Sequence, residues 1–339
     1  MYSDEDLDAA VADAVLNAAD VQSFRAFIER RRAQPAVDEE HFRLLTGFND
    51  IFVSIALVMI LGAVSYLGAQ ASYAVSGWAT AGAAWALAEF FTRKRRMALP
   101  SILLLCAWAL GSFFGTLAAL GGQVESLQEG EWSFLAASLL AVAVAVLHWR
   151  RFRVPITIAA GVAGLALTIA SLVAMLAPSW SAKLGSGLML LMGLAVFLLA
   201  LRWDASDPHR RSCNSDVAFW LHLLAAPLIV HPLFSALDLL DGEASLTQAL
   251  AGVGIYLLLG IIALLVDRRA LLVSALVYVI ASVSLLLKQT SSLGSGLAVT
   301  SLLVGLGLAV LSAFWHRSRG VALAALPQEI RNRLPAHGG

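Results

Sequence analysis

The sequence predicts an all-α fold: a polytopic transmembrane helical bundle of about ten spans with both termini in the cytoplasm. Three observations support this prediction: an apolar composition, long apolar runs that recur along the chain, and basic residues confined to alternate connections. The 339-residue chain is 59% hydrophobic and only 14% charged, whereas soluble domains carry about 25% charged residues. This composition is typical of a membrane protein.

The apolar runs define the predicted spans. A bilayer core of roughly 30 Å needs about 20 helical residues. Each run must be helical, because lipid offers no partner for an unpaired backbone group and the alternation of barrel strands is absent. A membrane domain of residues 50–317 follows. Its predicted spans are 50–69, 73–91, 98–120, 132–148, 154–176, 184–201, 217–237, 246–266, 270–287 and 293–315.

The basic residues predict the orientation of these spans. All but Lys183 and Lys288 of the 23 lysines and arginines fall on one side of the membrane. Positively charged connections stay in the cytoplasm, so both termini are predicted to be cytoplasmic. One missed or invented span would mix the two sides, so the segregation supports the count of ten. The net charge is zero, and we expect no nucleic-acid partner.

Short sequence matches indicate an internal repeat. KLGSGL at residues 183–188 resembles SLGSGL at 292–297, and AVSGW at 74–78 shares their Ser-Gly pair. The Ser-Gly pairs are 110 and 109 residues apart, and each opens a span that runs in the same direction. This pattern predicts a recurring hairpin unit rather than the inverted repeat of many transporters. The alternative is that small residues simply recur at helix starts.

The N-terminal end is predicted to lie outside the membrane. Residues 1–35 should form a cytosolic helical hairpin, because Ser3 and Asp6 make a capping box and apolar residues recur at helical spacing. So small a unit cannot bury a sufficient core alone. We therefore expect it to bind a protein partner, a second copy of the chain or the cytoplasmic face of the bundle.

Two further segments are predicted to be amphipathic. Residues 36–49 should form a connector that runs into the first span. Residues 318–339 should form an interfacial tail on the anionic inner leaflet, with Pro327 suited to a helix start. A frayed polar end is the alternative for the tail. The lipid bilayer is therefore an expected partner of the tail as well as of the spans.

The predicted span 217–237 carries the candidate functional residues. Proline removes a helical hydrogen bond and pushes the preceding residue away from helical angles, so we expect a kink or a break here. Freed carbonyls beside an imidazole can form an ion or proton site, and ionisable groups inside a membrane indicate function. We predict a proton- or solute-responsive site. Its candidate residues, all within FWLHLLAAPLIVHPLF, are His222, His231, Pro227 and Pro232.

A structural role is the alternative for these residues. A neutral histidine can tie one helix to another, and prolines are common in membrane helices. Haem is not expected, because His148 and His316 lie at span ends, too shallow to ligate a haem together with His222. Cys106 and Cys213 have neither disulfide nor metal spacing. We expect no cofactor and no metal.

Other polar and small residues are predicted to be structural. Glu89 precedes Arg93 by four residues, the favoured order for a helical ion pair. Gly111 and Gly115 form a small-xxx-small contact that lets helices approach closely. The sequence lacks a P-loop, HExxH, GxSxG and a cysteine cluster. We therefore expect no catalytic residues and no enzymatic activity.

The ends and the paired spans resemble a group of uncharacterised bacterial polytopic membrane proteins with a short cytosolic N-terminal helical hairpin. The resemblance is carried by DLDAAVADAVLNAADVQSFRAFIERRR, by DEEHFRLLTGFNDIFV and by the tail FWHRSRGVALAALPQEIRNRLP. It implies a multi-pass protein of the bacterial inner membrane. It implies no site residues, because no activity is established for the group.

Two functional hypotheses follow. In the first, the protein is a non-enzymatic membrane protein that transports or senses a small or amphipathic solute, with the proline-kinked span 217–237 as its moving element. In the second, it is a non-transporting scaffold that recruits a partner through residues 1–35. Scarcity of polar residues inside the membrane favours the scaffold, since a hydrophilic solute needs a lined path.

Overall fold

The computed structural model describes residues 4–13, 15–33, 48–123, 132–177, 182–207, 212–237, 245–290, 296–324 and 327–328. All regular secondary structure in these ranges is helical. The helices are α1 (Asp4–Ala12), α2 (Ala18–Ala33), α3 (Phe48–Ala69), α4 (Tyr73–Ala88), the π-helix η1 (Glu89–Lys94), α5 (Ala98–Ala119), α6 (Trp132–Phe152), α7 (Ile156–Leu176), α8 (Ala182–Ser206), α9 (Cys213–Ser235), α10 (Leu246–Val266), α11 (Ala270–Thr290), α12 (Gly296–Ala313) and α13 (Trp315–Ala324).

The chain divides into two units, of which the smaller comprises Met1–Arg43 and His337–Gly339. In it, α1 and α2 occupy the region where the sequence predicts a helical hairpin, and they contact each other. Val21 is buried, whereas half of Phe24 is exposed. The predicted connector lies mostly outside the described residues, and its last two residues already belong to α3.

The larger unit, Leu44–Ala336, is the membrane domain. Seven of its described helices are long and apolar enough to cross a bilayer, which makes the chain a multi-pass helical membrane protein. The predicted spans 73–91, 270–287 and 293–315 correspond to α4 with η1, to α11 and to α12, which are not among these seven helices. The seven helices are Asn49–Ala69, Ala98–Ala119, Trp132–Phe152, Ile156–Leu176, Gly185–Ser206, Cys213–Ser235 and Leu246–Val266.

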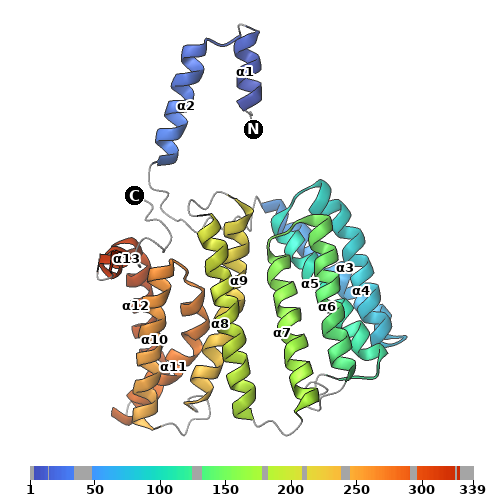
Figure 1. The fold of residues 1–339 in the computed structure, drawn as a ribbon, viewed down its shortest axis with the longest axis vertical. Coiled ribbons are helices and arrows are strands. Elements are labelled where there is room, and N and C mark those ends of the chain that lie inside the picture. The colour runs from blue at the N-terminus through green and yellow to red at the C-terminus, as the bar shows by residue number, and fades with distance from the viewer. Residues whose placement is uncertain are drawn as a thin grey trace. The chain divides into compact units, whose positions relative to one another are not determined.

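Sequential helices of this unit pack in pairs (Figure 1). Helix α4 packs along α5, α6 along α7, α8 along α9, and α10 along α11. Helix α9 contacts α7 on one side and α11 on another, and is the most buried of the seven. It therefore joins the helices before it to those after it.

Glycine lets α4 and α5 touch through their backbones. A Cβ added at Gly77 would lie 2.4 Å from the Cα of Gly115, and one added at Gly111 would lie 2.7 Å from the carbonyl oxygen of Gly77. The glycines that the sequence marks for helix packing thus line this contact. Deeper along the same pair, the rings of Trp85 and Trp108 lie 4.8 Å apart.

Helix α9 runs without a break from Cys213 to Ser235, through both Pro227 and Pro232. The break that the sequence allowed is therefore absent. Each proline still removes one backbone donor, so the carbonyls of Leu223 and Leu228 lose their usual partners. Packing of α9 against α7, α8 and α11 holds helical angles at positions where local preference opposes them.

The C-terminal helix begins earlier than the sequence predicts. Helix α13 starts at Trp315, directly after α12, and contacts α10. Pro327 lies beyond the end of α13, and Gln328 directly after it is helical; residues 329–339 lie outside the described part of the chain, so the predicted helix start at Pro327 stays a prediction. The predicted boundary at residue 318 falls inside α13. A buried stripe of Trp315, Arg319 and Leu323 explains this, because it packs against protein.

Candidate functional site

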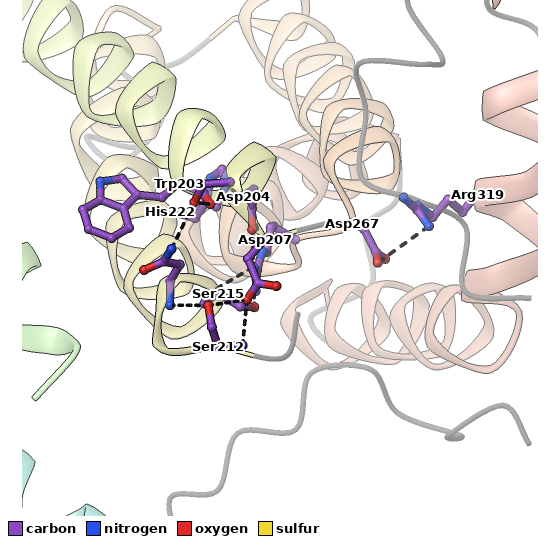
Figure 2. Close-up of polar contacts among 11 residues, drawn as sticks. Trp203, Asp204, Asp207, Ser212, Ser215, His222, Asp267 and Arg319 are labelled. Carbon is purple, nitrogen blue, oxygen red and sulfur yellow. Dashed lines mark hydrogen bonds and ion pairs between the residues drawn. The ribbon is translucent and has the colours of Figure 1, made fainter. Parts of the chain in front are cut away.

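A cluster of buried charged side chains joins the ends of α8 and α10 to α9 (Figure 2). Asp204 lies near the end of α8, His222 on α9, and Arg268 just after α10, with exposed fractions of 4%, 1% and 4%. Oδ2 of Asp204 lies 2.9 Å from Nε2 of His222. The other oxygen, Oδ1, accepts a hydrogen bond of 2.5 Å from Nη2 of Arg268. We call these three residues the buried triad.

One carboxylate in the buried triad therefore serves two nitrogen groups. Arg268 also approaches Oδ2 of Asp204 through Nε, at 3.4 Å, and the carbonyl oxygen of Ser215 through Nη2, also at 3.4 Å. The ring of Phe197 lies edge-on to His222, with centroids 5.2 Å apart. A buried charge needs such a set of partners, because desolvation otherwise costs several kcal/mol per ion.

Local structure at the start of α9 brings His222 to Asp204. Ser212 is the N-cap, and its hydroxyl accepts a hydrogen bond from the backbone N–H of Asn214. The carboxylate of Asp207, just after α8, accepts hydrogen bonds from both the backbone N–H and the hydroxyl of Ser212, each 2.8 Å. These hydrogen bonds connect the end of α8 to the start of α9 (Figure 2).

Arg268 is positioned by the end of α10. Asp267 caps that helix in the left-handed conformation, with φ 60° and ψ 45°, and the backbone N–H of Arg268 bonds to the carbonyl of Ala263 at 3.0 Å. Left-handed angles are unfavourable for a residue other than glycine. The turn keeps them because the side chains on both sides of it are held by partners.

A second buried group lies on the other side of this turn. Nε1 of Trp315 donates a 2.8 Å hydrogen bond to Oδ1 of Asp267, and Nη1 of Arg319 lies 3.7 Å from Oδ2. The guanidinium of Arg269 lies over the Trp315 ring, 4.8 Å from its centroid. Trp315 and Arg319 are both buried. Asp267 thus joins the end of α10 to α13.

The four candidate residues of α9 do not form one site. His222 belongs to the buried triad, but Nδ1 of His231 lies 2.5 Å from the hydroxyl of Tyr278 on α11, and His231 is exposed. Pro227 lies between the two histidines along α9, and Pro232 directly follows His231. The two histidines are nine residues apart, which puts their rings on opposite faces of a helix, and they contact different helices.

Sequence reasoning missed Asp204 and Arg268. Arg268 counted only as one of the basic residues that orient the spans, and Asp204, beyond the predicted end of span 184–201, was given no role. One signal was available: an isolated acid and an arginine at the ends of α8 and α10 meet at the same end of the bundle. Their separation of 64 residues hides the pairing from local patterns.

The predicted ion pair in η1 has a further partner. Oε2 of Glu89 lies 3.3 Å from Nη1 of Arg93, as the spacing suggested. Arg151, at the end of α6, donates hydrogen bonds to both oxygens of the same carboxylate, from Nε at 2.7 Å and from Nη2 at 2.9 Å. This side-on pair is the geometry that fits a guanidinium to a carboxylate best.

The two acid–arginine pairs occupy matching positions. Glu89 follows α4 and pairs with Arg151 at the end of α6, 62 residues later. Asp204 ends α8 and pairs with Arg268 after α10, 64 residues later. Because α4 and α8 also begin at matched Ser-Gly pairs, the geometry supports the predicted repeat. The first pair is partly exposed, whereas the second is buried and has gained His222.

A second buried histidine lies among aromatic rings. Nδ1 of His148 on α6 lies 3.0 Å from the hydroxyl of Thr157 on α7, and the ring of Phe152 is 4.7 Å away. Nε2 of His148 has no hydrogen-bond partner among the described residues. His148 therefore ties α6 to α7 and is remote in the chain from the buried triad.

The described residues bring together no group of three or more His, Cys, Asp or Glu side chains that could hold a metal ion. The chemistry available to the buried triad is proton exchange between an imidazole and a carboxylate, with a fixed cation beside them. Comparison with models of known protein families, with curated proteins and with solved structures finds no match to this chain. The resemblance to uncharacterised bacterial membrane proteins therefore stays a prediction.

Proposed function

We propose that the protein is a non-enzymatic multi-pass protein of the bacterial inner membrane that transports or senses a small or amphipathic solute. Helix α9 is its moving element, and the buried triad is its proton-responsive lock. The observation that carries the proposal is the single buried carboxylate of Asp204, shared by His222 and Arg268. Ionisable groups held inside a membrane bundle mark functional positions.

Charge balance explains how the lock responds to protons. With His222 neutral, the carboxylate of Asp204 and the guanidinium of Arg268 cancel, and the buried triad has no net charge. Protonation of His222 adds one positive charge to a dry site, which favours an arrangement that admits water. Histidine is the side chain whose ordinary titration falls between about pH 5 and 8. The lock is therefore closed while His222 is neutral and weakened once acid protonates it.

Nearby acids tune this balance. Asp216 on α9 interacts electrostatically with Arg268 and with Asp207, and Asp267 is engaged by Arg319 on the far side of the turn. When His222 is protonated, the imidazolium and the Arg268 guanidinium share the carboxylate of Asp204, while Asp216 also attracts Arg268. The response consequently belongs to the whole cluster.

The proposed topology has ten spans and cytoplasmic termini. Helices α4, α11 and α12, which are not among the seven long apolar helices, complete the proposed set of ten. The arginines then lie on the cytoplasmic side, beside the ends of α4, α6, α8, α10 and α12. The buried triad sits at that side of the bundle, within reach of cytoplasmic protons.

Hydrogen exchange of the protein in proteoliposomes tests the lock. Between pH 8 and 5.5, after correction for intrinsic exchange rates, amides of residues 217–226 should lose protection in the wild type. His222→Gln keeps a donor for Asp204 but cannot take up the proton, so it should abolish this pH dependence. His231→Gln is the matched control and should behave as the wild type. Equal protection of α9 at both pH values in the wild type would refute the proposal.

A scaffold is the second candidate function. Met1–Arg43 belongs to a unit separate from the membrane domain, and its Val15 and Phe24 are 74% and 51% exposed. Exposed apolar side chains on a small helical pair favour a protein partner or a second copy. Deletion of residues 1–35 discriminates: a scaffold should lose the cellular phenotype of the full chain, whereas a transporter core should keep it.

A further inference from the structure

The turn Asp267–Arg269 faces two buried groups at once. Arg268 reaches the buried triad on α8 and α9, while its neighbour Asp267 holds α13. We infer that α13 is a latch whose docking is coupled to the charge state of the buried triad through this turn. The inference rests on the proposed function. It adds that α13 is the element that leaves the turn Asp267–Arg269 when the lock opens.

Three contacts dock α13 on the turn. Asp267 accepts the indole N–H of Trp315 and pairs with Arg319 one helical turn later, and Arg269 covers the indole ring. Trp315, Arg319 and Leu323 are spaced by four residues and are all buried, so they form one face of α13. All three polar contacts depend on the placement of the turn.

The turn is built to move as a unit. Asp267 adopts left-handed angles that only its surroundings maintain, and the N–H of Arg268 closes the end of α10. Adjacent residues share a rigid peptide plane. Loss of the bonds between Asp204 and Arg268 removes one support of the left-handed turn, so the turn relaxes and the bonds of Asp267 to Trp315 and Arg319 change.

The charges around the turn favour release of α13 when the buried triad is protonated. Arg268 faces Asp204 from α8 and Asp216 and the Ser215 carbonyl from α9. Asp267 faces Arg319 from α13, and Arg269 faces Trp315. A proton on His222 or Asp204 weakens the hold on Arg268 and leaves a guanidinium beside Asp267. In either case the turn loses a contact that fixes it, and its hold on Trp315 and Arg319 weakens with it.

Cysteine accessibility on α13 tests the coupling at constant pH. The reporter is Leu323→Cys, on the buried face of α13, in a full-length chain that also carries Cys106→Ser and Cys213→Ser. Leu104→Cys, fully buried on α5, reports general unfolding in a parallel chain. The rate of maleimide modification is measured at pH 7.5 in proteoliposomes, with neutralising substitutions in the buried triad and in the turn.

Asp204→Asn and Arg268→Gln should each speed modification at position 323 by about tenfold, within the 5- to 150-fold range typical of coupled sites. Asp267→Asn should do the same directly. Both triad substitutions should raise the rate at position 104 much less than the rate at position 323. Glu89→Gln, which breaks the matching acid–arginine pair of the first half, should leave position 323 protected.

Two results would overturn the inference. If Asp267→Asn frees position 323 but Asp204→Asn and Arg268→Gln leave it protected, α13 is docked without coupling to the buried triad. If every triad substitution raises the rates at positions 323 and 104 alike, the bundle unfolds as a whole and no latch exists. The latch test compares variants at one pH, so it does not depend on the proton response. Hydrogen exchange of α9 that does not change with pH would refute the proposed function instead.

Discussion

Arg268→Gln should destabilise the protein strongly, because it leaves the Asp204 carboxylate buried with only His222 as a nitrogen partner. Asp204 and Arg268 are each 4% exposed, so water cannot replace the lost cation. Breaking a buried pair from one side costs about 3–5 kcal/mol, which is on the order of 10²- to 10³-fold in the folding equilibrium. Two observed hydrogen bonds to the carboxylate, at 2.5 and 3.4 Å, vanish with the guanidinium.

The sign of the pH dependence separates this account from simple loss of packing. In the variant, a protonated His222 supplies the missing positive charge beside Asp204. The destabilisation relative to the wild type should therefore shrink as the pH falls from 8 to 5.5. A packing defect would cost the same free energy at every pH.

Equilibrium unfolding in mixed detergent and SDS micelles, followed by tryptophan fluorescence, measures the effect. Arg151→Gln removes the matching arginine of the partly exposed first pair and should cost far less, because water screens that carboxylate. Asp204→Asn/Arg268→Gln should cost less than the sum of its single substitutions, because neither charge is left alone. A cost for Arg268→Gln no larger than that of Arg151→Gln, or strict additivity in the double variant, would refute the reasoning.

Two further predictions concern helix packing in the first half of the membrane domain. Gly77→Ala should destabilise the protein by about 1–3 kcal/mol, since its Cβ would lie 2.4 Å from the Cα of Gly115, whereas Gly82→Ala, with nothing within 4 Å, should not. Thermal unfolding of both variants checks this, and equal melting temperatures would contradict it. Thr157→Val should cost roughly 1–3 kcal/mol by leaving Nδ1 of His148 without its buried partner. Unfolding in detergent tests this, and an unchanged midpoint would show that the hydrogen bond contributes nothing.

Local sequence patterns predicted the elements well where one helix accounts for a feature. The i, i+4 spacing of Glu89 and Arg93 and the GSFFG glycines both lie where such patterns place them. Arg151 and Arg268 could not be predicted in the same way. Each reaches its acid across more than 60 residues. The partners meet only because α4 and α6 both pack on α5 in the first case, and because α9 and α10 both pack on α11, with α8 on α9, in the second.

The histidines illustrate the same limit. Sequence reasoning selected His222 for its place in an apolar, proline-containing run, and it lies in the buried triad. It also proposed His231, as a weaker candidate, and this ring faces Tyr278 on another helix. Prolines at 227 and 232 suggested a break, which the neighbouring helices suppress. A titratable residue in an apolar run thus indicates that a partner must exist without naming it.

Hydrophobicity and charge are properties of each residue, so the sequence alone determined that this chain forms apolar helices and which connections carry arginine. Contacts between distant residues depend on which helix faces which neighbour. Only the tertiary structure decided that Asp204, His222 and Arg268 share one dry site and that Asp267 turns away from them to hold α13. The physical reason is that a buried charge is tolerated only where side chains from several helices converge on it, and that convergence is not encoded in any one segment.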